Sequence, residues 1–167
     1  MAVSICLRLG PSGKNLKGES VITKHENEID VLAWNWGLTQ SASAHVSTGA
    51  SSGSADVKDL TITKYVDKSS PLLIKNCFIG ANHKDATLEV LKATGKGSDS
   101  ICMVRITMAG PVFISSVHTG EHGENDRFVE TVSFNFATVK FEYTGQKADQ
   151  TADSTVGSGD LKIAEKF

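Results

Sequence analysis

The residues best suited to metal chemistry in this sequence lie in one polar stretch, HTGEHGEND, at residues 118–126. His118 and His122 have the spacing by which a helix presents two histidines to one zinc ion. Gly120 and Gly123 argue against a helix here, and no third ligand is fixed by a predicted strand or helix. A solvated loop is therefore favoured over a metal site, and we expect no bound metal.

Other arrangements in the chain point no more strongly to catalysis. Ser115 and Ser116 lie within a predicted strand, whereas a catalytic serine needs a strained turn with a base nearby. Gly13 and Lys14 follow a strand, but a phosphate-binding loop needs more widely spaced glycines and a Ser or Thr after the lysine. We expect neither an enzyme nor a cofactor-binding protein.

The strand predicted most strongly is FVETVSFNFATVKFEY, residues 128–143. Apolar residues alternate with polar ones in two phases, which is typical of a half-buried strand. The phase changes near Ala137 and Thr138, where a β-bulge would bend the strand. The two apolar sets are Val132, Phe134 and Phe136, then Val139, Phe141 and Tyr143. A long aromatic strand that bends midway suits a sheet that curls into a barrel.

A second strand, EIDVLAWNWGLT at residues 28–39, has apolar residues on both faces. It is either buried on both sides within the chain or meets another chain with the face that carries Ile29 and Val31. Trp34 and Trp36 on this strand suit a core or an interface better than a sugar- or base-binding platform.

Further strands are expected from the same alternation, with Gly- and Pro-containing turns between them. They cover residues 3–9, 57–66, 86–93, 100–108 and 112–117, with a short edge strand at 161–164. One helix is expected, capped by Ser70, started by Pro71 and ended by Gly80. Its apolar stripe is Leu73, Ile74, Cys77 and Phe78. The sum predicts an all-β barrel or sandwich with a single short helix.

Two segments are too polar and Gly-rich to form a core. Residues 41–56, SASAHVSTGASSGSAD, predict a long extended loop, either a surface loop or an arm that orders against a neighbouring subunit. Residues 145–159 predict a flexible tail segment.

Length and composition limit the remaining possibilities. The 167 residues suit one domain, 1–167. A net charge of −2 gives no reason to expect nucleic acid as a partner, and the short apolar runs exclude membrane insertion by helices. The N-terminus lacks the features of a secretion signal, so we expect synthesis in the cytoplasm. Cys6, Cys77 and Cys102 predict three reduced thiols.

Three blocks of the chain resemble one family, the haemolysin-coregulated proteins (Hcp) of type VI secretion. They are KGES with EIDVLAWNWG (residues 17–20 and 28–37), DLTITKYVDKSSPLL (59–73), and ISSVHTG with DRFVETVSFNFATV (114–139). Together the matches cover nearly all of residues 1–149. The chain ends in DLKIAEKF, whereas family members often end in an aromatic-rich strand with a Trp.

The resemblance implies a β-barrel subunit similar in fold to bacteriophage tail-tube proteins. It implies a homohexameric ring, with rings stacked into a tube inside a contractile sheath and a spike protein at the tip. Sheath contraction would expel the tube, with effectors carried in its lumen, to the exterior or into target cells. Such export starts from the cytoplasm and needs no signal peptide.

A ring that also stacks needs pairs of complementary surfaces on each subunit. We expect them on the second strand, the extended loop and the C-terminal strand. The candidate interface residues are Ile29, Val31, Ala44, His45, Val46, Ser47, Leu161 and Ile163. The alternative function is a barrel that binds a small ligand, as lipocalins do.

Overall fold

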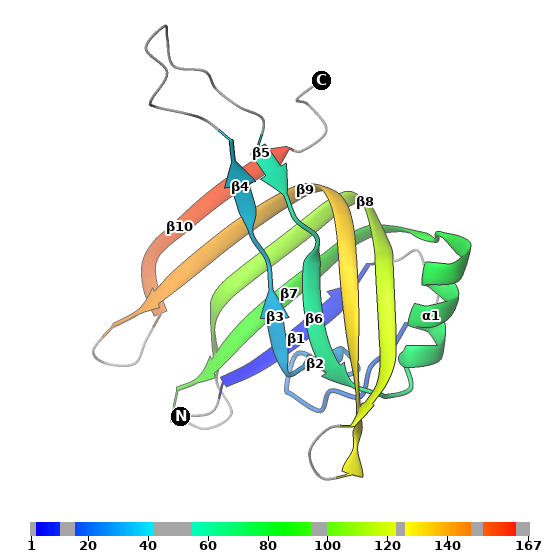
Figure 1. The fold of residues 1–167 in the computed structure, drawn as a ribbon. Helices are drawn as coiled ribbons and strands as arrows, with labels where there is room; N and C mark the ends of the chain where they lie inside the picture. The colour runs from blue at the N-terminus through cyan, green and yellow to red at the C-terminus, as the bar shows by residue number, and fades with distance from the viewer. Residues whose placement is uncertain are drawn as a thin grey trace, which may run out of the picture.

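The computed structural model describes residues 3–10, 16–41, 55–94, 100–122, 126–147 and 152–162. Figure 1 shows a strongly curled sheet with one helix beside it. The elements within the described residues are β1 (Val3–Leu9), β2 (Ile29–Val31), β3 (Ala33–Asn35), β4 (Leu38–Gln40), β5 (Ala55–Val57), β6 (Leu60–Tyr65), α1 (Ser70–Ile79), β7 (Asn82–Ala93), β8 (Ser100–His122), β9 (Phe128–Gln146) and β10 (Ala152–Lys162).

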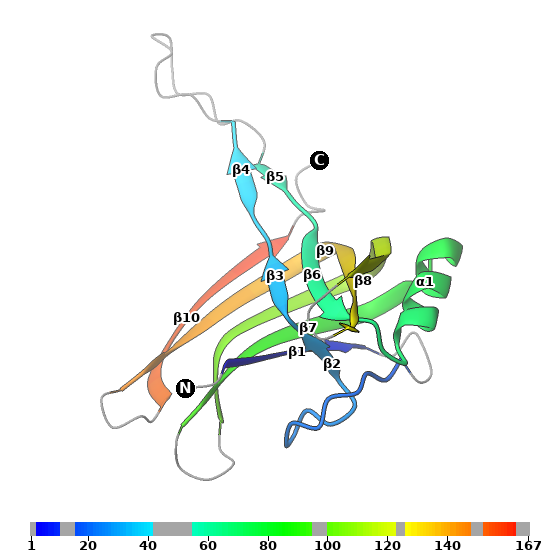
Figure 2. The same cartoon turned by 60° about the horizontal axis from the view of Figure 1, so that its bottom comes forward.

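The main sheet curls far enough for its two ends to meet. Its strands run in the order β2-β1-β7-β8-β9-β6-β3, all antiparallel, and β10 is added alongside β9. The two end strands, β2 and β3, are separated by Leu32 alone, whose backbone N–H donates to the Thr63 carbonyl of β6 at 2.7 Å. The chain itself therefore joins the two ends of the sheet, which gives the barrel-like shape in Figure 2.

Apolar side chains from the curled strands fill the interior. Each such residue contributes roughly 1.5–3 kcal/mol when it is fully buried. The buried core comprises Leu7, Ile29, Val31, Leu60, Ile62, Leu73, Ala86, Leu88, Ile106, Met108, Val112, Ile114, Val132, Phe134, Phe136 and Val139. The predicted mainly β, barrel-like fold with one helix is confirmed.

The predicted phase change in the long strand is also present. On β9 the buried positions run through Phe134 and Phe136 and then shift to Val139. β8 takes three steps from Ala109 to Val112 where β9 takes two, so β8 carries the extra residue at this irregularity. The turn predicted near residues 109–111 is therefore wrong. One strand continues through it, because β7 and β9 pair with β8 on both sides of this point.

The strand predicted at residues 28–39 is divided into three. The chain pairs with β1 as far as Val31, crosses to β6 from Ala33, and leaves the main sheet to form a ribbon of β4 and β5. Each change of partner ends one strand and begins the next. The strand predicted at 57–66 is divided likewise, into the end of β5 and β6.

The helix ends where the sequence predicts but starts on a different cap. Gly80 adopts a left-handed conformation (φ 62°) that favours glycine, and Pro71 lies in the first turn. The N-cap is Ser69, and Ser70 is instead inside the helix, with its hydroxyl on Glu130. The predicted stripe is half right, because Leu73 is buried and Cys77 packs on the core, whereas Ile74 and Phe78 are exposed.

The predicted tail at residues 145–159 is largely a strand. β10 pairs with β9 from Ala152 to Lys162, so its glycines and serines are held by backbone hydrogen bonds along a strand that offered an open side. The three cysteines are free thiols, as expected. Among the described residues, no helix has the length and apolar character to cross a membrane.

Candidate assembly surfaces

Several large apolar side chains lie on the surface instead of in the core. Contiguous exposed apolar groups on a protein surface usually mark a place of interaction. The exposed members are Val3, Val21, Leu32, Leu38, Val66, Ile74, Phe78, Ile79, Phe128, Tyr143 and Leu161. Two sets within this group, one on α1 and one on β9 with β10, lie on different sides of the barrel (Figure 1).

The first set, here called the helix patch, consists of Ile74, Phe78 and Ile79. Leu73 and Cys77 pack on the core because α1 rests against one side of the barrel, while Ile74, Phe78 and Ile79 are left exposed. Phe78 is 89% exposed. An aromatic ring left in water on a well-formed helix is the kind of side chain that another molecule covers.

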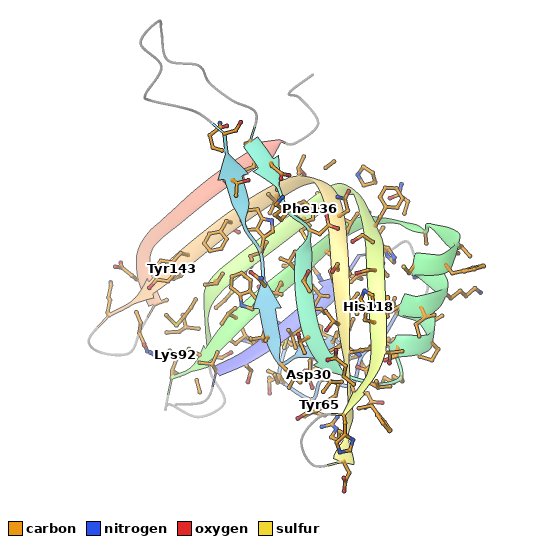
Figure 3. All side chains as sticks on the ribbon, viewed as in Figure 1. Asp30, Tyr65, Lys92, His118, Phe136 and Tyr143 are labelled. Carbon is orange, nitrogen blue, oxygen red and sulfur yellow. The ribbon has the colours of Figure 1, made fainter. Side chains whose placement is uncertain are left out.

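The second set, here called the edge patch, consists of Tyr143 on β9 and Leu161 on β10. Leu161 lies directly opposite Val139, a core residue, so both point to the same face of the sheet. Tyr143 is two steps of alternation further along that face, and Figure 3 places it toward the end of β9, beyond the bend near Phe136. The face that is core at Val139 therefore continues beyond the covered barrel, where Tyr143 is 48% and Leu161 38% exposed.

A third surface is the ribbon of β4 and β5, which projects from the barrel (Figure 2). The three residues of β4 are all exposed, and within the described part of the chain β4 and β5 pair only with each other. Trp36 anchors its base, with the indole N–H on the Lys58 carbonyl at 3.0 Å and its ring stacked on Phe141. Because an isolated two-stranded ribbon is marginally stable in water, this one gains from any surface that it contacts.

The predicted interface residues fall into three groups. Ile29 and Val31 are 1% and 7% exposed, because the strand curls and turns this face into the core. The expectation that they contact another subunit is therefore wrong. Leu161 is exposed at the edge patch, and its role stays a prediction. Ala44, His45, Val46, Ser47 and Ile163, with most of the extended loop, lie outside the described residues.

A buried ionic network positions the helix and was not predicted. The Lys64 and Glu130 side chains are both 0% exposed, with Nζ and Oε1 2.8 Å apart. The Lys64 ammonium also donates to Asp67 Oδ1 at 2.9 Å and to the Tyr65 carbonyl at 2.7 Å, while the Ser70 hydroxyl donates to Glu130 at 2.7 Å. β6, β9 and the start of α1 are thus tied together at one point. The sequence did indicate that Lys64 is buried, since strand alternation places it on the same side as the core residues Leu60 and Ile62.

The histidine cluster predicted as a loop lies mostly on a strand. β8 extends to His122 with an irregularity at Gly120 (φ 101°), so His118 and His122 do not have the helical spacing that presents two histidines to one ion. His122 is exposed, with Asp126 3.9 Å away. Among the described residues, one group of three possible metal ligands does lie together, Cys6, His25 and Glu28.

The curled sheet, the single helix and the projecting ribbon together define a mainly β, barrel-like class of protein. A family model described as type VI secretion system effector, Hcp, matches residues 10–143. The chain is 41% identical over 153 residues to protein hcp1 of Pseudomonas aeruginosa, which covers 92% of this chain and 90% of that protein.

Solved structures agree with this relationship. A type six secretion system protein superposes with a TM-score of 0.87 at 26% identity, covering 99% of each chain. Hcp1 from Salmonella typhimurium gives a TM-score of 0.74 at 28% identity and covers 98% of this chain and 97% of its own.

The chain belongs to the Hcp family of type VI secretion. Membership supports a structural subunit of the secreted tube that associates with itself, and it implies a protein that is not an enzyme.

Proposed function

We propose that this chain forms six-membered rings that stack into the type VI secretion tube. The observation that carries the proposal is the pair of exposed apolar patches on different sides of one barrel in a member of the Hcp family. A closed ring needs one surface of each subunit to meet a different surface of the next, and two separate patches suit that requirement.

Within a ring, the helix patch of one subunit meets the edge patch of its neighbour. Phe78 and Ile79 supply apolar area on one side, and Tyr143 and Leu161 supply it on the other. Interface cores favour aromatic residues, and each patch carries one, Phe78 or Tyr143. Covering the edge patch would extend the barrel core across the subunit boundary.

Between rings, the β4–β5 ribbon and the loop that it carries act as a docking arm. Ala44, His45, Val46 and Ser47 are the proposed contacts on the loop, and Ile163 contributes near the C-terminus. The projection of the ribbon and its exposed β4 side chains support this role.

The tube would lie within a contractile sheath, with a spike protein at its tip, and sheath contraction would expel it from the bacterial cytoplasm. Effectors would travel in the lumen, which we propose is lined by exposed Ser, Thr and Lys side chains of the curved strands. A small-ligand barrel is disfavoured, because core side chains fill the inside of the curled sheet.

Negative-stain electron microscopy of the purified chain, with light scattering for mass, tests the central proposal. We expect six-fold rings, with some stacked at high protein concentration. A sample that stays monomeric at high concentration would overturn the proposed function.

The ring contact is tested with Phe78→Ser, matched against Val21→Ser. Both side chains are 89% exposed, but Val21 lies outside the two patches. We expect Phe78→Ser to shift the mass from hexamer to monomer without lowering the melting temperature of the monomer, and Val21→Ser to keep rings. Rings of normal mass in both variants would exclude the helix patch.

The docking arm is tested by deleting residues 44–54. The deleted chain should still fold and form single rings, but stacking should be impaired. Replacing the same residues by a Gly-Ser segment of equal length separates the effect of length from that of side chains. Unchanged tube formation in both variants would remove the arm from the proposal.

A further inference from the structure

The segment that precedes β2 covers β1 on the side away from the core. Leu7 faces the core, so strand alternation turns Cys6 to the opposite face, yet Cys6 is also fully buried. Ser20 lies over it, with its Oγ 3.9 Å from the Cys6 Sγ. The covering segment is folded back on itself by two backbone hydrogen bonds. The Ser20 N–H donates to the Glu28 carbonyl, and the Asn27 N–H donates to the Ser20 carbonyl.

Gly18 allows the backbone of this segment to lie close to the backbone of Glu28 and Ile29. A Cβ at Gly18 would lie 2.1 Å from the Glu28 carbonyl oxygen, a distance that no side chain could accept. The close approach holds His25 and Glu28 above β1 in a tight turn, where the His25 N–H donates to the Ile22 carbonyl at 2.8 Å. Residues distant from Cys6 in the sequence are thus fixed beside it.

Three side chains with metal-binding atoms meet at this place, and a fourth, that of Glu89, lies beside His25. Candidate ligand atoms of Cys6, His25 and Glu28 all lie within 4.8 Å of one another. The His25 Nδ1 is 2.9 Å from Glu28 Oε2 and 3.5 Å from Glu89 Oε2. Glu89 lies on β7 directly opposite Cys6. His25, Glu28 and Glu89 are each only about one-sixth exposed, so a small ion could enter without a large rearrangement.

The charges around the thiol favour a cation. The carboxylates of Asp30, Glu28 and Glu89 all lie near the Cys6 thiol and place negative charge beside it. Arg105 is the cation that balances part of this charge, with its Nε 2.6 Å from Glu89 Oε1. That contact leaves Glu89 Oε2 turned toward His25 and holds the carboxylate in place, as outer-shell partners of metal ligands do.

We propose that Cys6, His25, Glu28 and Glu89 bind one Zn²⁺ ion. A thiolate, an imidazole and carboxylates are the ligands that zinc uses in four-coordinate sites. Bonds of 2.0–2.3 Å in a tetrahedron put ligand atoms about 3.5 Å apart, so shifts of about one ångström bring the ligand atoms of Cys6, His25 and Glu28 to that spacing, with Glu89 as the fourth ligand. The Cys6 thiol releases its proton to solvent as the Zn–S bond forms.

Such an ion would staple the segment of residues 18–28 to β1 and β7, and would add a structural metal to a barrel subunit. The site does not include the helix patch or the edge patch. Zinc binding and ring assembly are therefore separate measurements, and failure of one leaves the other intact.

The test uses the full chain without a polyhistidine tag, stripped with EDTA under reducing conditions. Zn²⁺ is added in the presence of a chromophoric chelator to count the bound ions, and Co²⁺ is added as a spectroscopic probe for a thiolate ligand. Thermal melts with and without Zn²⁺ measure the stabilisation that binding confers on the folded chain. The variants are Cys6→Ser and His25→Gln, matched against Cys77→Ser and His122→Gln.

We expect one tightly bound Zn²⁺ per chain, a thiolate-to-Co²⁺ charge-transfer band, and a melting temperature several degrees higher with Zn²⁺. Cys6→Ser and His25→Gln should lose all three effects, while Cys77→Ser and His122→Gln should keep them. If Cys6→Ser does not fold, His25→Gln and Glu28→Gln decide, because both side chains are partly exposed. No binding, or binding that survives His25→Gln, would overturn the site and leave a hydrogen-bond network only.

Discussion

The two halves of β9 have the same alternating pattern but different surroundings. From Val129 to Phe134 the strand lies between β8 and β6, and Val132 and Phe134 are fully buried. From Thr138 onward it lies between β8 and β10, and its core-side face goes from buried Val139 to exposed Tyr143. The barrel half is completed by the chain itself, whereas the edge half has apolar area that a second subunit can cover.

The largest expected difference comes from truncating the core-side aromatic residue in each half. Phe134→Ala should lower the free energy of unfolding by about 3–5 kcal/mol, because it leaves a cavity among buried side chains. Tyr143→Ala should lower that of the monomer by about 1 kcal/mol or less. Urea unfolding of dilute, monomeric protein measures both values. Equal losses would show that the two halves are covered alike.

An ion pair in each half gives the next comparison. Lys64→Met should cost about 3–5 kcal/mol, because Glu130 is left buried without its partner. The matched change in the edge half is Lys140→Met, which removes a partly exposed contact with Glu142 (3.0 Å) and should cost less than about 1 kcal/mol.

The double variant Lys64→Met/Glu130→Leu sharpens this measurement. It should recover most of the stability that Lys64→Met loses, since no buried charge then remains. Urea unfolding gives all three values. A double variant as unstable as the single one would mean that Lys64 acts through its contacts with Asp67 and the Tyr65 carbonyl.

A charge placed at the edge patch should affect assembly more than folding. Leu161→Asp should dissociate rings into monomers, because the carboxylate would lose its water inside the proposed contact. The monomer should melt within a few degrees of the unchanged chain. Light scattering and thermal melts separate the two effects, and Val21→Asp is the control. Intact rings with Leu161→Asp would move the contact elsewhere.

The smallest expected effect concerns Cys102, a partly buried thiol in β8 beside the edge half. Burial, followed by the nearby Glu89 carboxylate, raises its pKa from 9.0 to about 11. The unfolded chain therefore ionises first as pH rises, so this stabilising contribution is complete below pH 9 and is lost toward pH 11. The unfolding free energy of Cys102→Ser should fall less steeply over that range. If the unfolding free energies of the two chains fall equally steeply between pH 9 and pH 11, the raised pKa of Cys102 is contradicted.

Features that depend on neighbours in the sequence were predictable from it. The bounds of β1, the left-handed stop at Gly80 and the phase change on β9 near Ala137 all follow from local alternation or from the conformational freedom of glycine. The family resemblance rests on the same local blocks, and it is confirmed. Of the candidate interface residues within the described chain, Leu161 alone lies on the surface.

Features that depend on which strands meet were decided only by the tertiary structure. Ile29 and Val31 became core residues because the sheet curls until β2 and β6 touch, and β10 formed from a Gly- and Ser-rich segment because β9 had an open side to pair with. Folding brings Lys64 into contact with Glu130 and places Cys6 beside His25, although both pairs are far apart in the sequence. Alternation fixes which side of a strand is apolar, but whether that side is covered, and by which partner, depends on contacts between residues far apart in the chain.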